Sequence, residues 1–288
     1  MAVNVKDYDL DRENTWCPGC GNFAILDVLK NTLADLGLAP NQVMVISGIG
    51  QAGKMPGHFR VNTFNVLHGR VLPAATGISL ANSNLKILAI GGDGDGLAEG
   101  GNHLIHAAHR NIDVTYLMHN NMVYGLTKGQ VSPTSDKGLK TPTTPGGNPI
   151  AGLNPIQLLL GLKASFVARS FSGNKEQLGN IIAKAIEKPG FAFIDILQPC
   201  PSFNKVNTHG WFKKRVYDIN NEGHNPNNLS DAFKASMEWG ERIPTGIFYD
   251  EQEARPVFNE ALISSQDQPL VEAELNPLDV EEIMKEHL

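Results

Sequence analysis

Oxygen-bearing side chains follow two predicted strands of this sequence, and together they could bind a metal ion. Asp93 and Asp95 lie in the glycine-rich turn GGDGDG, directly after the apolar run LKILAI. Asn121 stands 28 positions after Asp93, in the turn that follows the run DVTYLM. Carboxylates at such a turn would repel a phosphate unless a cation lay between them, and Mg²⁺ or Ca²⁺ prefers carboxylate, amide and carbonyl oxygens. Because open α/β folds bind ligands beyond the carboxyl ends of their strands, we expect Asp93 and Asn121 to face one ion.

Three cysteines form a second set of residues with possible chemistry. Cys17 and Cys20 make a tight C-x2-C in WCPGCG, and Cys200 follows a later strand in LQPCP. The C-x2-C fits half of a zinc site, a redox dithiol or two ligands of an iron–sulfur cluster. A thioredoxin-like dithiol should follow a buried strand, which the polar run DYDLDRENT is not. By itself the C-x2-C is compatible with both the zinc site and the iron–sulfur cluster.

Two glycine-rich turns imitate nucleotide-binding motifs without completing them. The run GIGQAGK at 48–54 has the spacing of a P-loop, but Met55 replaces the Ser or Thr that ligates Mg²⁺, and Pro56 disrupts the phosphate-binding helix. We interpret it as a turn that lets the backbone pass close to another group. From Gly92 and Gly94, the third glycine of a dinucleotide fingerprint should stand at position 97, which is leucine. That fingerprint is therefore excluded.

The elements that would position these residues alternate between helix and strand. Apolar residues at helical spacing predict the helices, and continuous apolar runs predict buried strands. This alternation favours an α/β fold, with a mostly parallel sheet covered by helices on both faces. The stretch Thr127–Leu153 is rich in Gly, Pro, Ser and Thr, and a loop of that length is usually a lid or an interface segment. The expected helices are Asn22–Leu36, Pro73–Asn82, Leu97–His109, Pro155–Leu162 and Asn174–Ile186, and the expected strands are Gln42–Ile46, Leu85–Ile90, Asp113–Met118, Ala164–Arg169 and Phe191–Leu197.

The last part of the chain has a different character. Beyond Pro199 the sequence becomes polar and rich in Asn, with one expected helix at Ser230–Met237 and an acidic, weakly helical end at Val271–Leu288. We therefore divide the chain into an α/β domain at 1–199, which includes the N-terminal cysteine segment, and an irregular C-terminal extension at 200–288. The extension is expected to wrap a partner subunit rather than to fold as an independent domain.

Composition excludes several classes of protein. The chain has 288 residues and a net charge of −6, from 24 Lys and Arg against 30 Asp and Glu, so we expect no nucleic-acid partner. No apolar run approaches the roughly 18 residues of a membrane span, and the acidic N-terminus lacks the apolar core of a signal peptide. Three cysteines are too few for a disulfide scaffold. We expect a cytoplasmic protein that does not insert into a membrane.

The pairing of GDG with Asn-Asn resembles the thiamine-diphosphate signature. Taken with WCPGCG, SGIG-x2-GK, LHGR, VYGLTKGQ-x-SPT and LQPCP, it makes the region from Trp16 to Tyr217 similar to the β subunit of 2-oxoacid:ferredoxin oxidoreductases. The resemblance implies the diphosphate-binding half of a thiamine enzyme, with the pyrimidine half and the activating glutamate on a separate α subunit. It implies conversion of a 2-oxoacid, CoA and oxidised ferredoxin into acyl-CoA, CO₂ and reduced ferredoxin, or the reverse, in an αβ or (αβ)₂ assembly. The GGDGD turn and the short separate chain are closest to enzymes that act on 2-oxoglutarate, with broad-specificity 2-oxoacid enzymes next.

The same resemblance assigns a cofactor site. Asp93, the Asn121 side chain and the Val123 carbonyl would hold Mg²⁺ against the diphosphate, for which Gly92 and Gly94 leave room. The helix that follows would offer its positive end to the phosphates. The residues implied to bind the cofactor are Ser47, Gly48, Ile49, Gly50, His68, Gly92, Asp93, Gly94, Asp95, Asn121, Val123, Tyr124, Gly125, Leu126 and Thr127.

Two lysines are candidates for contact with the substrates. By the resemblance, Lys54 would pair with the substrate carboxylate, and Lys128 with Thr127 would line the substrate or CoA side. The alternative for either lysine is a solvated surface charge. For His68 the alternative to cofactor contact is a hydrogen-bonded structural role.

The cysteines match an iron–sulfur cluster of that family, with one departure. The family usually places a cluster cysteine directly after SGIG, where this sequence has Gln51. Cys17, Cys20 and Cys200 match the remaining ligand positions and could hold a 3Fe cluster, or a 4Fe–4S cluster whose last iron takes another ligand. Gln51 is a poor ligand for iron beside sulfide, so His58 or a residue of the partner chain is an alternative.

Two further functions remain open, the first suggested by Gln51 and the second by the cysteines. One is a non-oxidative thiamine-dependent decarboxylase or ligase that has lost the cluster. The second is a non-enzymatic partner protein, in which the three cysteines and a histidine bind structural zinc.

Overall fold

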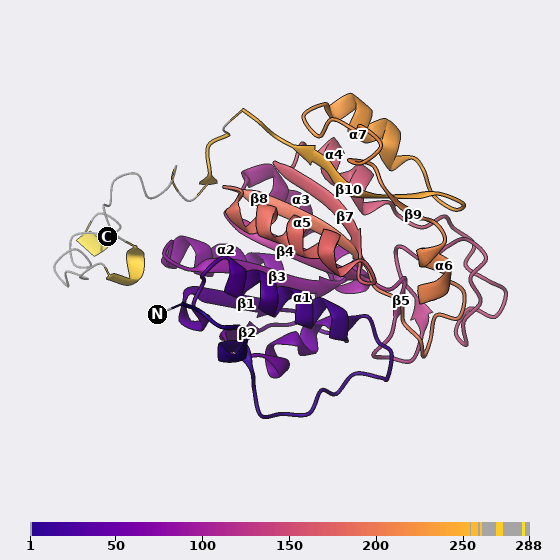
Figure 1. Ribbon diagram of the computed structural model, residues 1–288, viewed down its shortest axis with the longest axis horizontal. Helices are drawn as coiled ribbons and strands as arrows, with labels where there is room; N and C mark the ends of the chain where they lie inside the picture. Colours follow the sequence, from indigo (N-terminus) through magenta and orange to yellow (C-terminus); the bar gives the residue numbers. More distant parts are fainter. Residues whose placement is uncertain (1, 254, 259, 261–268, 273–283, 286–288) are drawn as a thin grey trace.

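The chain folds around one sheet in which most strands run parallel (Figure 1). The computed structural model describes residues 2–253, 255–258, 260, 269–272 and 284–285. Within them, the main sheet has the strand order β2-β1-β3-β4-β8-β7-β10-β9, and a separate small sheet joins β5 to β6. The strands are β1 Val43–Ser47, β2 Asn62–Asn65, β3 Lys86–Gly92, β4 Val114–Asn120, β5 Val123–Tyr124, β6 Gln130–Val131, β7 Phe166–Phe171, β8 Phe191–Leu197, β9 Val216–Asp218 and β10 Ile243–Asp250.

Strand direction confirms the expected parallel sheet. Every neighbouring pair from β2 to β7 is parallel. At the far side of the sheet, β10 runs antiparallel to β7 and carries β9 in parallel at the edge. The carboxyl ends of β1, β3, β4 and β8 therefore lie together at one end of the strands.

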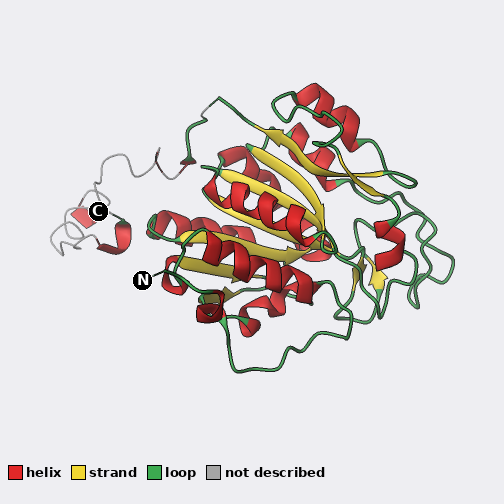
Figure 2. Cartoon of the chain, in the orientation of Figure 1, coloured by secondary structure: helices red, strands yellow, loops and turns green. Residues whose placement is uncertain are grey.

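Helices cover both faces of the sheet, as Figure 2 shows. Side chains of β3 alternate between the two faces: Leu88 and Ile90 pack with α1 and α5, whereas Ile87 and Ala89 pack with α2, α3, α4 and α7. These two apolar layers confirm the predicted α/β architecture. The helices are α1 Asn22–Asp35, α2 Val71–Ala81, α3 Gly101–Arg110, α4 Pro155–Gly161, α5 Lys175–Glu187, α6 His209–Lys213 and α7 Leu229–Ser236. None of the helices in the described ranges is both long and apolar enough to span a membrane.

The predicted helix Leu97–His109 is wrong at its start. Gly94–Glu99 forms a π-helical turn, η4, and the α-helix begins only at Gly101. Gly94 and Gly96 within η4 and Gly100 directly after it weaken regular α-helix formation there, and such wide turns are frequent at functional sites. The strand β2 was also missed, because its sequence NTFN is polar and its side chains are mostly exposed.

The region after Pro199 adds two strands to the main sheet. The expected helix at Ser230–Met237 is confirmed as α7. The strand β10 was not predicted, because Pro244 and Gly246 interrupt its pattern and a register shift follows Ile247. The expected helical end at Val271–Leu288 lies largely outside the described residues, of which Leu270–Glu272 forms a short 3-10 turn, η5.

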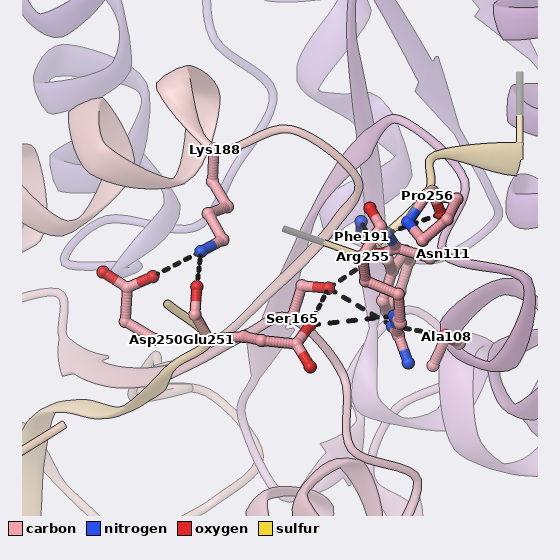
Figure 3. A network of polar contacts seen from close by, with 9 residues as sticks. All are labelled: Ala108, Asn111, Ser165, Lys188, Phe191, Asp250, Glu251, Arg255 and Pro256. Carbon is pink, nitrogen blue, oxygen red and sulfur yellow. Dashed lines mark hydrogen bonds and ion pairs between the residues drawn. The ribbon is translucent and has the colours of Figure 1, made fainter. Parts of the chain in front are cut away.

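A polar network fastens the chain that follows β10 to the amino ends of β7 and β8 (Figure 3). Asn111, which ends α3 in the left-handed conformation (φ +54°), accepts hydrogen bonds from Ser165 Oγ (2.8 Å) and Phe191 N (2.9 Å). Its Nδ2 donates to the carbonyl of Pro256 (3.3 Å). One buried amide thus joins a helix end, two strands and the C-terminal segment, at the end of the sheet opposite the polar turns.

The long stretch Thr127–Leu153 is mostly turns, as expected, but much of it packs inward. Ser132, Thr134 and Ser135 are buried, and Leu139 packs against Val123 and Cys200. The segment therefore forms a wall behind the turns at the carboxyl ends of β3 and β4.

Candidate functional site

A cavity of about 70 Å³ lies at the carboxyl ends of β1, β3 and β4. The structure brings together there thirteen of the fifteen residues expected to bind a cofactor, leaving out Ser47 and Gly48. The lining residues are Ile49, Gly50, Gln51, Ala52, His68, Gly92, Asp93, Gly94, Asp95, His119, Asn121, Val123, Tyr124, Gly125, Leu126 and Thr127.

Asp93 is a buried carboxylate at the end of β3. Its side chain is 1% exposed, and its Oδ2 accepts hydrogen bonds from the hydroxyls of Ser132 (2.5 Å) and Thr134 (2.6 Å). Burial raises the pKa of Asp93 to about 6, while the two hydroxyls oppose that rise. Among the described residues no basic side chain forms an ion pair with Asp93. The carboxylate therefore lacks a counter-charge within that part of the chain, and a bound cation would supply one.

A series of polar contacts fixes the residues around Asp93. Thr134 Oγ1 lies 2.9 Å from Asn120 Oδ1, and Asn120 Nδ2 donates to Asp195 Oδ1 (2.9 Å). Asp195 in turn accepts from Arg169 Nε (2.8 Å), and both members of this ion pair are buried. The negative charge of Asp195 adds to the rise in the pKa of Asp93. The contacts leave Asp93 little freedom to turn away from the cavity.

Asp95 holds neighbouring turns together. Its Oδ1 accepts hydrogen bonds from the main-chain N–H groups of Ile49 (3.1 Å) and Gly69 (2.9 Å), and lies 2.9 Å from His68 Nδ1. Burial raises the pKa of Asp95, and these three partners lower it. A Cβ added at Gly48 would stand 2.2 Å from Asp95 Oδ2, so this glycine admits the carboxylate. Asp95 and Gly48 therefore shape the cavity and place His68 beside it.

Ser47, which also lies outside the cavity lining, fixes the first turn. Its hydroxyl donates to the carbonyl of Gly53 (3.0 Å) and accepts from Asn65 Nδ2 (2.9 Å). Its side chain is buried. Ser47 therefore acts on the turn after β1.

The glycines of the GGDGDG turn have different surroundings. A Cβ at Gly94 would stand 2.2 Å from the ring of Tyr124, and one at Gly96 would stand 2.1 Å from the hydroxyl of Tyr116. At Gly92 the nearest atom is the carbonyl oxygen of His119, at 3.9 Å. Gly94 and Gly96 are thus required by packing, whereas Gly92 borders the open space of the cavity.

The turn after β4 brings amide and carbonyl oxygens toward Asp93. Asn121 Oδ1 accepts from Val123 N (3.0 Å), and Met122 between them takes a positive φ of +60°. Asn204 Nδ2 fixes the turn from outside by donating to the carbonyl of Asn121 (3.2 Å). An amide oxygen has two lone pairs, so Asn121 Oδ1 can cap this turn and still accept a cation. With one carboxylate and an amide and carbonyl oxygen available, the donor set fits Mg²⁺.

His119 lines the cavity, although it is not among the site residues predicted from the sequence. Its Nδ1 lies 2.8 Å from Asn22 Oδ1, and its buried Nε2 has no partner within the described residues. Burial lowers the pKa of His119 to about 3, so the ring is neutral. Its place at the end of an entirely buried strand was the only available signal, and that pattern is equally typical of a core histidine.

The two candidate lysines stand apart from the cavity lining. Lys54 lies in the 3-10 turn Ala52–His58, η3, and Lys128 follows the cavity residue Thr127 with a positive φ of +76°. Both remain candidates for contact with a substrate that extends beyond the cavity.

The three cysteines come together next to this cavity. Burial raises the pKa of Cys20 to about 11, and the charges of Cys200 and Cys17 add to that rise. Gln198 Nε2 lies 3.3 Å from Cys20 Sγ, and all three cysteines are free thiols. Neighbouring thiols from the N-terminal segment and the end of β8, with an N–H group directed at one sulfur, fit an iron–sulfur cluster.

The described part of the structure gives no comparable support for a site at which three such side chains bind one metal ion, such as a structural zinc site. Within the described ranges, no three His, Cys, Asp or Glu side chains come close enough to bind one metal ion. The thiolates of a polynuclear cluster bind different irons and are held farther apart. The predicted Mg²⁺ site has only one carboxylate, so this observation does not bear on it.

Two known families match successive parts of the chain. Residues 44–196 match the family described as "Thiamine pyrophosphate enzyme, C-terminal TPP binding domain". Residues 200–267 match the family of C-terminal regions of the pyruvate ferredoxin oxidoreductase beta subunit. The two matches meet at the end of β8, where Cys200 stands.

Individual relatives agree with these families. The chain is 42% identical over 278 residues to the 2-oxoacid:ferredoxin oxidoreductase subunit beta of Saccharolobus solfataricus, covering 92% of this chain and 88% of that protein. It is 45% identical over 199 residues to the 2-oxoglutarate oxidoreductase subunit KorB of Mycobacterium tuberculosis, covering 69% of this chain and 53% of that protein. A solved structure, 2-oxoglutarate:ferredoxin oxidoreductase from Magnetococcus marinus with 2-oxoglutarate, coenzyme A and succinyl-CoA bound, has a TM-score of 0.90 at 34% identity and covers 98% of this chain and 96% of that one.

Proposed function

This chain belongs to the 2-oxoacid:ferredoxin oxidoreductase β subunits, and we propose that it binds thiamine diphosphate in an enzyme that decarboxylates 2-oxoglutarate oxidatively. The observation that carries the proposal is the meeting of a buried Asp93 with an open Gly92 and three nearby thiols at one edge of the sheet. The products would be succinyl-CoA, CO₂ and two reduced ferredoxins, with release of one proton, and the enzyme could run in reverse. The protein is expected to work in the cytoplasm.

The residues of this chain would bind and orient the cofactor. Asp93, Asn121 Oδ1 and the Val123 carbonyl would hold Mg²⁺, and the space beside Gly92 would admit the diphosphate. Asp95 would keep His68 at the cavity wall. When bound, thiamine diphosphate supplies the nucleophilic carbon and the electron sink for decarboxylation.

The three cysteines would hold the cluster that transfers electrons away from that site. Cys17, Cys20 and Cys200 would hold an iron–sulfur cluster of the 4Fe–4S type beside the cavity wall at Gly125. The Gln198 amide, 3.3 Å from Cys20 Sγ, would stabilise the added negative charge of a reduced cluster. Ferredoxin would then accept one electron at a time.

Substrate assignment rests on the relatives and on the lysines. The names of several relatives and of the similar solved structure refer to 2-oxoglutarate, and that structure holds 2-oxoglutarate and coenzyme A. Lys54 would pair with a substrate carboxylate, and Lys128 with Thr127 would face the CoA side. A dicarboxylate needs more positive charge than a monocarboxylate, so Lys54→Met should reduce activity with 2-oxoglutarate more than with pyruvate.

The proposed enzyme needs an α subunit. The cavity in this chain, about 70 Å³, is well below the ~300–1,000 Å³ of a typical small-molecule site. A partner that brings the pyrimidine half and its glutamate would complete it. We propose that the 200–288 region wraps this partner in an αβ or (αβ)₂ assembly.

The test is co-expression with the α subunit under anaerobic conditions. We expect 2-oxoglutarate to reduce ferredoxin or methyl viologen only when thiamine diphosphate and CoA are present. Asp93→Ala should abolish cofactor retention, measured as bound thiamine diphosphate per complex. Full retention in that variant would overturn the metal assignment.

The same preparation separates the alternative functions. An aldehyde product without acceptor reduction would favour a non-oxidative decarboxylase that has lost the cluster. One zinc per chain, without iron, sulfide or thiamine diphosphate, would favour a structural partner protein.

A further inference from the structure

Gln51 stands between the cavity and the three cysteines. It lines the cavity, and its Cγ lies 3.7 Å from the point where a Cβ of Gly125 would stand. Cys200 Sγ lies 3.8 Å from that same point. The Gln51 side chain and the Cys200 thiol therefore share one side of Gly125.

The backbone of Gln51 is also fixed beside Cys17 and Cys20. Trp16 Nε1 donates to the carbonyl of Gln51 at 2.8 Å, and Trp16 directly precedes Cys17. Trp16 is buried between Phe23 and His58, with ring centroids 5.4 and 4.4 Å away, so this anchor cannot move freely. Gln51 is thus held by Trp16, while its side chain lies against the same glycine as the Cys200 thiol.

The side-chain oxygen of Gln51 lacks a hydrogen-bond donor. Its Oε1 is buried and has no partner among the described residues. A buried carbonyl oxygen without a partner costs about 1–3 kcal/mol, so native proteins rarely leave one. An electron-poor atom held near the Cys200 thiol would satisfy it.

We propose that Gln51 occupies the fourth corner of the iron–sulfur cluster, so that one iron has no thiolate and faces Oε1. This rests on the proposed function, because it requires the cluster. Three thiolates hold three irons, while a hard amide oxygen binds iron weakly beside sulfide. Since Gln51 also lines the cavity, it would lie between the distinct iron and the proposed cofactor site.

The distinct iron should be lost more easily than the remaining three. Removal of one electron by ferricyanide converts a 4Fe–4S cluster of charge +2 into one of charge +3. Release of Fe²⁺ then leaves a 3Fe–4S cluster of charge +1, so that iron and charge balance. A cluster with four thiolates resists this step because each iron keeps a strong ligand.

The experiment compares anaerobically purified αβ complexes of the wild type, Gln51→Cys, Gln51→Ala and Gln252→Cys. Gln252 is exposed, so its variant controls for an added thiol. Each complex receives one equivalent of ferricyanide and EDTA, and iron, sulfide, thiamine diphosphate and the EPR spectrum are measured. We expect the wild type and Gln252→Cys to lose one iron in four and to show a three-iron signal. Gln51→Cys should keep all four irons, and Gln51→Ala should lack the fourth before oxidation.

Two outcomes would overturn the proposal while the proposed function stands. If the wild type keeps its fourth iron as firmly as Gln51→Cys does, another strong ligand is present. If Gln51→Ala holds four irons as the wild type does, Oε1 is not at the corner, and loss of iron in His58→Ala would place the ligand there. Complexes that contain thiamine diphosphate but neither iron nor sulfide would instead refute the cluster of the proposed function, and this proposal with it.

Discussion

Asp93 is a carboxylate that the fold holds out of water next to two hydroxyls and a second buried acid. Its pKa of about 6 in the folded chain is above its ordinary value of 3.8, with burial as the main cause. The folded state therefore favours the protonated carboxyl, whereas a Mg²⁺ ion requires the ionised one. At the scale of the residue, stability without metal and affinity for metal depend on pH in opposite directions.

We expect the metal-free chain to become less stable as pH rises through about 6. Asp93 contributes at most roughly 3 kcal/mol to the free energy of unfolding. This contribution is fully present at pH values below the ordinary pKa and is lost at pH values above the raised pKa. Mg²⁺ with thiamine diphosphate should stabilise the complex increasingly over the same range. Thermal unfolding of wild type and Asp93→Asn between about pH 4 and pH 8 measures both effects. The difference between the two proteins isolates Asp93, because Asp95 remains in both, and superimposable profiles would contradict the assignment.

Neighbouring glycines of the GGDGDG turn should respond differently to the same substitution. Gly92→Ala places its Cβ in open space, so we expect a normal Tm but at least about tenfold weaker binding of thiamine diphosphate. Gly94→Ala forces a Cβ to 2.2 Å from the Tyr124 ring, so stability should fall by about 1–3 kcal/mol. Gly101→Ala is the control, since its Cβ would meet no atom of the described chain within 4 Å. Calorimetric titration and thermal unfolding test this, and unchanged cofactor binding in Gly92→Ala would argue that the phosphates lie elsewhere.

Residue types and spacing could indicate the glycines, Asp93 and Asn121, because metal binding and tight turns restrict which residues can stand there. They could not separate Asp93 from Asp95, whose roles differ only through the partners that the fold provides. They also could not identify His119, since a histidine at the end of a buried strand has the same sequence pattern whether it borders a cavity or the core. The approach of Gln51 and Cys200 to the same glycine, Gly125, joins distant parts of the chain and has no local signal.

At the scale of elements, the parallel strands were predictable and the edges of the sheet were not. Buried strands such as β4 and β8 are apolar on both faces and stand out in the sequence. The edge strand β2 is polar, and β10 contains a proline and a glycine and bends at a register shift. The π-helical turn η4 replaces the expected start of a helix because its glycines and the packing of Asp95 set the backbone there.

The end of α3 offers a test of how the elements are joined. Asn111→Ala removes the acceptor for Phe191 N and Ser165 Oγ and places alanine at a φ of +54°. We expect a loss of roughly 2–4 kcal/mol in the free energy of unfolding. Asn111→Gly keeps the left-handed backbone, so it should recover about 1 kcal/mol of that loss. Denaturant unfolding measures both, and thiamine diphosphate binding at the opposite end of the sheet should not change; equal stability of all three proteins would show that the amide does not stabilise the fold.

At the scale of the molecule, the cavity lies beside an exposed apolar surface and is not enclosed by this chain alone. Phe64 and Leu67 are 52% and 78% exposed and stand close in sequence to His68, which lines the cavity. Apolar side chains exposed beside a polar site are typical of a surface that a partner covers. The chain alone should therefore be inactive, and the α subunit is expected to cover this face.

Two truncations distinguish the parts of the C-terminal region. Removal of 261–288 leaves β10 and the contact between Asn111 and Pro256 in place, so the Tm of the chain should change little. If this segment wraps the α subunit as proposed, its loss should weaken the αβ complex at least about tenfold, or 1.4 kcal/mol. Removal of 243–288 also deletes β10 and exposes the edge of β7, so that chain should fail to fold. Calorimetry of the purified chains and titration with the α subunit measure these effects. If the chain without 261–288 keeps both its stability and its affinity for α, the end of the chain takes no part in the subunit interface. The interface would then lie only on the sheet and its turns.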